Sequence, residues 1–137
     1  MKSIYLDAAK LQRFIDSTYA AHLKKFQLTP IEAHVLIALN ETGAMMASEL
    51  ARCVGRAAVS FTPILDRLQE CGYLERQSHP TDRRAVVITL TEAGRVLFPA
   101  LNDALISAHD EVCTSFFKVG HPARQFVEQY LMTGKPY

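Results

Sequence analysis

Two short helical patterns separated by a tight turn constrain this chain more than any other feature of its sequence. The segment 47–54 reads ASELARCV and is followed by Gly55, a residue that commonly ends helices. The segment 64–71 reads ILDRLQEC and is followed by Gly72. Each carries apolar side chains at the spacing of one buried helix face. Two short helices joined by a turn at residues 55–57 form a helix-turn-helix.

The start of the second helix is open to two interpretations because of Pro63. Proline in a helix interior removes a backbone donor and clashes with the preceding turn. This favours a helix capped by Ser60, with Pro63 in the first turn, where the missing N–H has no intrahelical partner. A helix that starts near Ala57 would instead hold the proline inside. Both interpretations keep the helix and give it an unusual first turn.

A hairpin is predicted directly after this helix pair. The segments YLERQ, at residues 73–77, and AVVITL, at residues 85–90, have the composition of strands. The segment SHPTDRR between them is rich in turn-forming and charged residues. A hairpin that follows a helix-turn-helix is a wing, so the sequence favours a winged fold.

The clearest helix start lies further upstream, in LTPIEAHVLIAL. Thr29 is placed as the cap, Pro30 as the first helical residue and Glu32 as the third, which together form a capping box. The helix is expected to run to about Asn40.

Longer amphipathic helices are predicted at both ends of the chain. Residues 7–26 repeat apolar side chains at helical spacing, and Asp7 is a plausible cap. Thr91 is expected to cap a long helix in which Pro99 produces a kink or marks the effective start. A last short helix is predicted over residues 122–132.

Four stretches carry a resemblance to a known family: LTPIEAHVLIAL, SELARCVG, ILDRLQECGYLER and DRRAVVITLTEAG. The last is the most specific, since Asp82 and Arg84 are followed by the pair Leu90 and Thr91 in the pattern of that family's wing. With these stretches in this order, the sequence resembles the MarR family of winged helix-turn-helix regulators. Met45, Met46 and Ala47 depart from the pattern, because the family usually has a Ser or Thr cap there.

The resemblance implies a mainly α fold with a small β-hairpin wing, in one domain over residues 1–137. The winged helix-turn-helix core would span about 28–95, and dimerisation helices would span about 5–26 and 95–132. It also implies a homodimer that binds pseudo-palindromic operator DNA, acts as a repressor and is released by a small effector. A dimer would present two recognition helices about one duplex turn apart.

Six polar residues are the candidate contacts to double-stranded DNA: Arg56, Ser60, Thr62, Arg67, Arg83 and Arg84. Hydroxyls near a helix start reach phosphates or base edges, and arginine suits the narrow minor groove. By resemblance, Asp82 pairs with one wing arginine and stiffens the tip. Other roles stay open for two of them: Ser60 as a helix cap, and Arg67, which follows Asp66, in a contact to the backbone or in a local pair. His79, in the same loop, is a candidate for a contact that depends on pH.

A small apolar or phenolic effector is implied by resemblance, and five residues are its candidate contacts: Tyr19, His22, Phe26, His34 and Ile37. Core or dimer packing is the alternative interpretation of the same residues. Cys53 and Cys71 are expected on inward-facing helix positions, and a thiol switch at Cys113 is a minor hypothesis.

Other classes of function receive no support from the sequence. It has no apolar run long enough to span a membrane, no clustered metal ligands, and no GxGxxG, GxxxxGK or HExxH motif. We therefore expect a cytoplasmic protein without a cofactor or bound metal, and not an enzyme. The net charge of only +1 leaves one alternative function, a winged-helix module for protein interaction without specific DNA binding.

Overall fold

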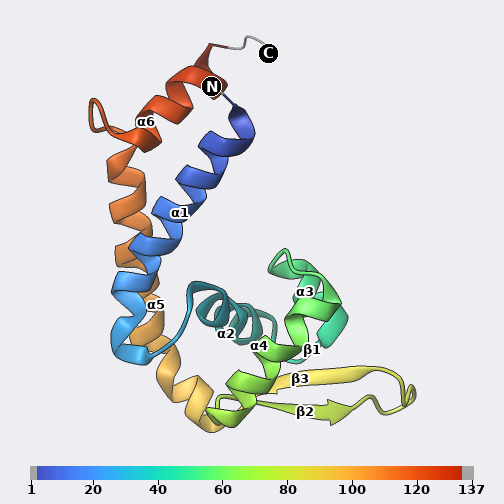
Figure 1. Cartoon of the computed structure of the whole chain (residues 1–137). Coiled ribbons are helices and arrows are strands. Elements are labelled where there is room, and N and C mark those ends of the chain that lie inside the picture. Colours follow the sequence, from blue (N-terminus) through green and yellow to red (C-terminus); the bar gives the residue numbers. More distant parts are fainter. Residues whose placement is uncertain (1–2, 134–137) are drawn as a thin grey trace. The chain divides into compact units, whose positions relative to one another are not determined.

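The computed structural model describes residues 3–133, which form helices and one small antiparallel sheet (Figure 1). The helices and strands in chain order are α1 (Ile4–Leu23), η1 (Lys24–Phe26), α2 (Pro30–Thr42), β1 (Met45–Met46), α3 (Ala47–Cys53), α4 (Ala58–Glu70), β2 (Leu74–Ser78), β3 (Val86–Leu90), α5 (Glu92–Ser115), α6 (Pro122–Phe126) and η2 (Val127–Met132). This confirms the predicted mainly α fold with a hairpin wing. The chain divides into two compact units, Leu28–Asn102 and the two terminal segments, which are described separately.

The first unit begins at the predicted capping box. The Thr29 side chain accepts a hydrogen bond from the backbone N–H of Glu32, and the Glu32 carboxylate accepts one from the backbone N–H of Thr29 at 2.8 Å. Pro30 occupies the first turn, where a missing N–H costs no intrahelical bond. The start of α2 is therefore fixed by side chains adjacent in the sequence.

The helix pair α3 and α4 forms the predicted helix-turn-helix. Gly55 takes the left-handed backbone conformation, with φ of 71°, which glycine adopts without steric cost. The backbone N–H of Arg56 then bonds to the carbonyl of Ala51 at 2.8 Å and closes the turn. Figure 1 shows α2, α3 and α4 gathered beside the hairpin.

The helix α4 begins at Ala58, so Ser60 is not its cap and that prediction is wrong. Ala57 has the extended backbone of a cap residue, and the Ser60 hydroxyl donates to the Ala57 carbonyl at 3.0 Å. Pro63 lies inside the helix. The helix therefore lacks the hydrogen bond that a donor at this position would make to the carbonyl of Val59.

The sheet has three strands rather than the predicted two. β3 lies in the centre and pairs with β2 on one side, with Leu74 opposite Leu90. On the other side Met45 pairs with Ile88 and Met46 with Val87. Met45 and Met46, which stand near the position of the family's usual helix cap, thus form a short strand that joins the start of α3 to the wing.

A single group of buried apolar side chains joins the helices and the sheet of this unit. The buried side chains are Leu28, Ala33, Val35, Leu36, Leu39, Leu50, Ala51, Phe61, Leu65, Leu68, Leu74, Ala85, Ile88, Leu90 and Leu101. Phe61, Leu65 and Leu68 form the inner face of α4. Burial of large apolar side chains stabilises the fold by about 1.5–3 kcal/mol each relative to exposure. The opposite face of α4 is left exposed.

A close approach joins the end of α4 to the start of α5. Thr91 caps α5 by accepting from the backbone N–H of Gly94 at 3.1 Å, and its hydroxyl donates to the Gly72 carbonyl at 2.5 Å. A side chain at Gly94 would overlap the carbonyl oxygen of Tyr73. The helix starts at Glu92 and continues through Pro99, so the proline does not mark the start.

The second unit combines α1, the later part of α5, and α6 with η2. The first helix begins at Ile4 after Ser3, so Asp7 is not its cap; its carboxylate instead accepts a hydrogen bond from the Tyr130 hydroxyl. His22 on α1 lies 2.5 Å from the Glu111 carboxylate on α5. α1 also packs against α6, where the rings of Phe14 and His121 meet edge to face.

Candidate nucleic-acid interface

The exposed face of α4 is the first part of the candidate interface. Ser60, Thr62 and Pro63 are exposed, and Val59 is 90% exposed. Both hydroxyls point back along the helix: Ser60 donates to Ala57, and Thr62 donates to the Ala58 carbonyl at 3.4 Å. Their oxygens retain acceptor capacity for a ligand. The face therefore offers two hydroxyls beside an apolar surface of a kind suited to thymine methyl groups.

Arg67 has a partner that the sequence did not indicate. Its Nη1 donates to the carboxylate of Glu32, which is 3% exposed and lies in the first turn of α2. Burial raises the pKa of the Glu32 carboxyl, but hydrogen bonds from Thr29 and from Arg67 outweigh it, so the pKa lies below the ordinary value. The same contact raises the pKa of Arg67. Arg67 therefore pairs with a residue of another helix, thirty-five positions away in the sequence.

Asp66 pairs instead with Arg76 at the start of the wing. Nη2 of Arg76 lies 2.7 Å from the Asp66 carboxylate, and Nη1 donates to the side chain of Gln69 at 2.7 Å. Since Arg76 is on β2 and both partners are on α4, one guanidinium ties the wing to α4. Sequence reasoning missed Arg76; its only signal was a basic residue in the strand that follows an acidic helix.

The wing tip presents Arg83 and Arg84 in a compact turn. The backbone N–H of Ala85 bonds to the carbonyl of Asp82 at 3.2 Å, so the two arginines occupy the central positions of a four-residue turn. Both are exposed, and in the described part of the chain neither guanidinium makes an ion pair. Two cations therefore project together from the tip.

Asp82 stiffens this turn in a way that differs from the prediction. Its carboxylate accepts the backbone N–H of Arg84 at 2.9 Å, and within residues 3–133 it makes no ion pair with a wing arginine. The predicted pairing is therefore wrong, because the short Asp side chain closes on its own turn. His79 adds a second support, since its Nδ1 lies 3.2 Å from the backbone nitrogens of both Thr81 and Asp82.

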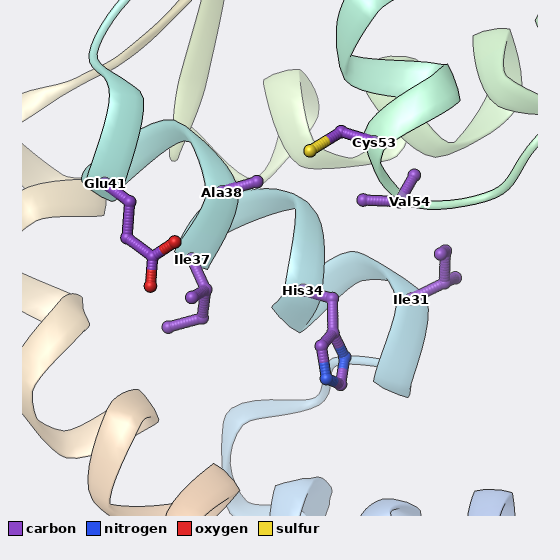
Figure 2. Close-up of a pocket in the computed structure, with 7 residues that line it drawn as sticks. All are labelled: Ile31, His34, Ile37, Ala38, Glu41, Cys53 and Val54. Carbon is purple, nitrogen blue, oxygen red and sulfur yellow. The ribbon is translucent and has the colours of Figure 1, made fainter.

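Two of the candidate effector contacts border a hollow in the first unit. Figure 2 shows its lining from α2 and the end of α3: Ile31, His34, Ile37, Ala38, Glu41, Cys53 and Val54. The hollow measures about 390 Å³. His34 Nδ1 lies 2.6 Å from the Pro30 carbonyl, and because a carbonyl only accepts, that nitrogen carries the proton.

The other three candidates, Tyr19, His22 and Phe26, belong to the second unit. Burial, followed by the nearby Cys113, raises the pKa of Tyr19. His22 is engaged with Glu111. The structure thus brings His34 and Ile37 to one hollow, and the contact of all five with one effector stays a prediction.

The cysteines differ from expectation. Cys53 and Cys71 are exposed, not inward-facing, because α3 and α4 place Leu50 and Leu68 on their buried sides. Cys113 is half-buried, with its Sγ 3.5 Å from Nε2 of His109. Within residues 3–133 no group of three or more potential metal ligands occurs, and no helix there is long and apolar enough to cross a membrane.

Comparison with known proteins decides the family. The sequence profile described as the MarR family matches residues 28–86. The HTH-type transcriptional regulator MhqR of Bacillus subtilis is 30% identical over 135 residues, covering 90% of this chain and 93% of MhqR. The chain belongs to the MarR family. This family consists of transcriptional regulators rather than enzymes.

Further MarR-family relatives match a shorter segment. YfiV and YcgE of Bacillus subtilis, both described as uncharacterized HTH-type transcriptional regulators, are 34% and 36% identical over 77 and 78 residues. These segments cover 56% and 57% of this chain but 48% and 51% of the two relatives. The chain therefore spans about half the length of these two relatives.

The fold of this MarR-family chain is similar to two solved structures of other proteins bound to DNA. Reduced AbfR bound to DNA is 28% identical, with a TM-score of 0.70 over 74% of this chain and 73% of AbfR. The transcriptional repressor CouR bound to a 23-mer DNA duplex is 25% identical, with a TM-score of 0.72 over 92% of this chain and 87% of CouR.

Proposed function

We propose that this MarR-family regulator is a repressor that binds a pseudo-palindromic operator as a homodimer, with α4 in the major groove and the wing arginines in the minor groove. The observation that carries the proposal is the rigid link between the two reading elements. Arg76 joins β2 to both Asp66 and Gln69 in the second half of α4, so the strand that carries the wing is tied to the helix. A preformed pair of contacts loses little ordering entropy on binding.

The contact chemistry divides between the two elements. The exposed start of α4 supplies the hydroxyls of Ser60 and Thr62 and the apolar surface of Val59 and Pro63. This surface suits a few base edges and thymine methyls rather than a long polar readout. The wing supplies Arg83 and Arg84, whose charge matches the enhanced negative potential of a narrow minor groove. Arg56, exposed in the turn before α4, is placed to meet a phosphate.

The homodimer is supported by apolar surface on the second unit. Its described residues include eight large apolar side chains that are at least 41% exposed: Ile4, Tyr5, Leu6, Ile106, Phe117, Val119, Leu131 and Met132. Exposed apolar side chains in this number are typical of an interface. Two copies related by a two-fold axis would also match a pseudo-palindromic site.

Release by a small effector is the regulatory part of the proposal. The hollow lined by His34 and Ile37 is predominantly apolar and adds polar groups at Glu41 and Cys53, which suits a small aromatic ligand. The hollow lies between α2 and α3, and α3 packs against α4. A bound effector would therefore shift α3 and, through it, the position of α4. We place this regulator in the cytoplasm, where operator DNA is accessible.

Selection of operators from random duplex DNA with the purified protein tests this function. The expected result is enrichment of an inverted repeat with half-sites about one helical turn apart. A matched selection with the Arg83→Ala, Arg84→Ala double variant should enrich the repeat weakly or not at all. Failure of the unmodified protein to enrich any sequence, together with no binding at low salt, would favour the protein-interaction module instead.

A further inference from the structure

His79 directly follows the last residue of β2, Ser78, and is the first residue of the loop at the tip of the wing. Its backbone N–H donates to the carbonyl of Ala85 at 3.1 Å and closes the hairpin. Its side chain turns into the loop and is half-buried. The following residue, Pro80, restricts His79 to an extended backbone. The hydrogen bond to Ala85 and the restriction by Pro80 therefore fix the backbone that carries the imidazole.

The imidazole is an acceptor in this arrangement. Nδ1 lies 3.2 Å from the backbone nitrogen of Thr81 and 3.2 Å from that of Asp82. The Thr81 hydroxyl oxygen lies at the same distance. Backbone N–H groups only donate, so Nδ1 must carry the lone pair and the ring proton must be on Nε2. The hydroxyl can reverse its role, but the two amides cannot.

The amide that His79 holds belongs to the first residue of the arginine turn. Asp82 begins the turn whose central residues are Arg83 and Arg84, and its own carboxylate accepts the Arg84 amide. His79 and Asp82 thus act in sequence: the imidazole fixes Asp82, and Asp82 fixes the backbone of Arg84. We propose that His79 is the positioning residue of the DNA-reading wing, and that its protonation at Nδ1 releases the wing arginines.

Protonation would replace the acceptor with a donor facing two other donors. Histidine is the side chain that ordinarily changes charge between about pH 5 and pH 8. The charged groups of the hairpin are few. Arg76 on β2 is paired with Asp66, Glu75 on β2 lies four residues from His79, and β3 carries no titratable side chain.

The charged groups of the tip itself are Asp82, Arg83 and Arg84. No other titratable group lies between His79 and Val86 in the sequence. Both amide hydrogen bonds require the lone pair of Nδ1, so they exist only while Nδ1 is unprotonated. The ordered tip and the neutral imidazole are therefore coupled.

This inference rests on the proposed function. The direction in which DNA affinity changes with pH distinguishes it from direct contact between His79 and DNA. An imidazolium that touched a phosphate would strengthen binding as the pH falls. An imidazole that holds the tip would weaken binding, because the protonated ring releases Arg83 and Arg84. Two substitutions distinguish the ring nitrogens. In His79→Asn the side-chain oxygen takes the position of Nδ1 and can accept hydrogen bonds from the amides of Thr81 and Asp82. In His79→Gln the side-chain amide lies near the position of Nε2 and cannot replace Nδ1 as the acceptor.

The test measures the affinity of the full-length protein for the selected duplex by fluorescence anisotropy, at about pH 8 and about pH 5.5 and constant ionic strength. At the higher pH, His79→Asn should bind like the unmodified protein, and His79→Gln should bind about fivefold more weakly. At the lower pH, the unmodified protein should lose about fivefold relative to His79→Asn. Equal affinity of His79→Gln at the higher pH, or a relative gain at the lower pH, would overturn the proposal.

A second readout works without DNA. In ¹⁵N-labelled protein, the amide resonances of Thr81 and Asp82 should shift as the pH falls, and their protection from solvent exchange, relative to the intrinsic rate at each pH, should decrease. Neither change should occur in His79→Asn. Unchanged amides would overturn the His79 inference even where DNA binds. Responsive amides in a protein that binds no DNA would instead contradict the proposed function and leave the positioning of the tip supported.

Discussion

Arg67 on α4 donates a hydrogen bond to the buried carboxylate of Glu32 on α2, thirty-five residues earlier in the chain. The same carboxylate completes the capping box with Thr29. One acidic side chain thus fixes the start of α2 and also the orientation of α4. This contact gives Arg67 a structural role, and its proposed DNA contact would use the part of the side chain that stays exposed, about 45%.

Removal of the arginine should destabilise the winged unit. In Arg67→Ala a buried carboxylate loses its cationic partner, which costs about 1–3 kcal/mol and lowers the melting temperature by several degrees. Arg95→Ala is the control, because Arg95 lies in the same unit and makes only an exposed pair with Glu92. A double cycle with Glu32→Gln should show a coupling of about 0.5–3 kcal/mol, and strict additivity would contradict the link.

The capping box predicts an acid dependence of stability. The pKa of Glu32 is lower in the folded chain than its ordinary value of 4.5, so the folded state favours the ionised form. This contribution is fully present above pH 4.5 and is lost as the pH falls through the folded pKa. Denaturant unfolding at several pH values should show the unmodified protein losing stability relative to Glu32→Gln below pH 4.5. A constant difference would contradict this assignment.

The close approach at the start of α5 predicts an intolerant glycine. In Gly94→Ala the added methyl meets the backbone carbonyl of Tyr73, which cannot move aside as a side chain would. We expect a loss of about 1–3 kcal/mol, measured by urea unfolding monitored by circular dichroism. Ala93→Gly, at the exposed neighbouring position, is the matched control and should cost about 0.5–1 kcal/mol. A neutral Gly94→Ala would mean that the end of α4 and the start of α5 are free to separate.

The proposed effector hollow predicts a response to small aromatic acids. Binding to the folded state raises the melting temperature in proportion to ligand occupancy, so a panel of aromatic acids should include members that shift it. Ile37→Asp, on the wall of the hollow, should abolish the shift. A flat response across the panel in the unmodified protein would count against a ligand site there.

Local patterns were sufficient to predict the order of the elements. The capping box at Thr29, the stop at Gly55 and the charged tip before Val86 all act over a few residues, and the structure confirms each of them. The strand at Met45 was missed because two residues carry no periodicity, and its pairing partner lies forty-three positions away at Ile88. Strand pairing over such a distance has no local signature.

The site was predictable in outline but not in its contacts. The exposed wing arginines follow from charge in a turn, and their positions agree with the prediction. The partners of Arg67, Arg76 and Asp82 were wrong or missing, because each depends on packing between elements or on turn geometry. Ser60 was predicted as a cap because Pro63 disfavours a helix interior. In the structure α4 starts at Ala58 and includes Pro63, because tertiary packing of its inner face outweighs the local cost of the proline.

One equilibrium titration distinguishes sequence-specific DNA binding by α4 and the wing from non-specific binding. The affinity for the selected duplex and for a scrambled duplex is measured over a salt series, with the unmodified protein and with Arg84→Ala. We expect a steep loss of affinity with salt and a preference of about a thousandfold or more for the selected duplex. Arg84→Ala should weaken specific binding about tenfold and reduce the salt slope by about one. Equal affinity for both duplexes, or an unchanged Arg84→Ala, would contradict the account.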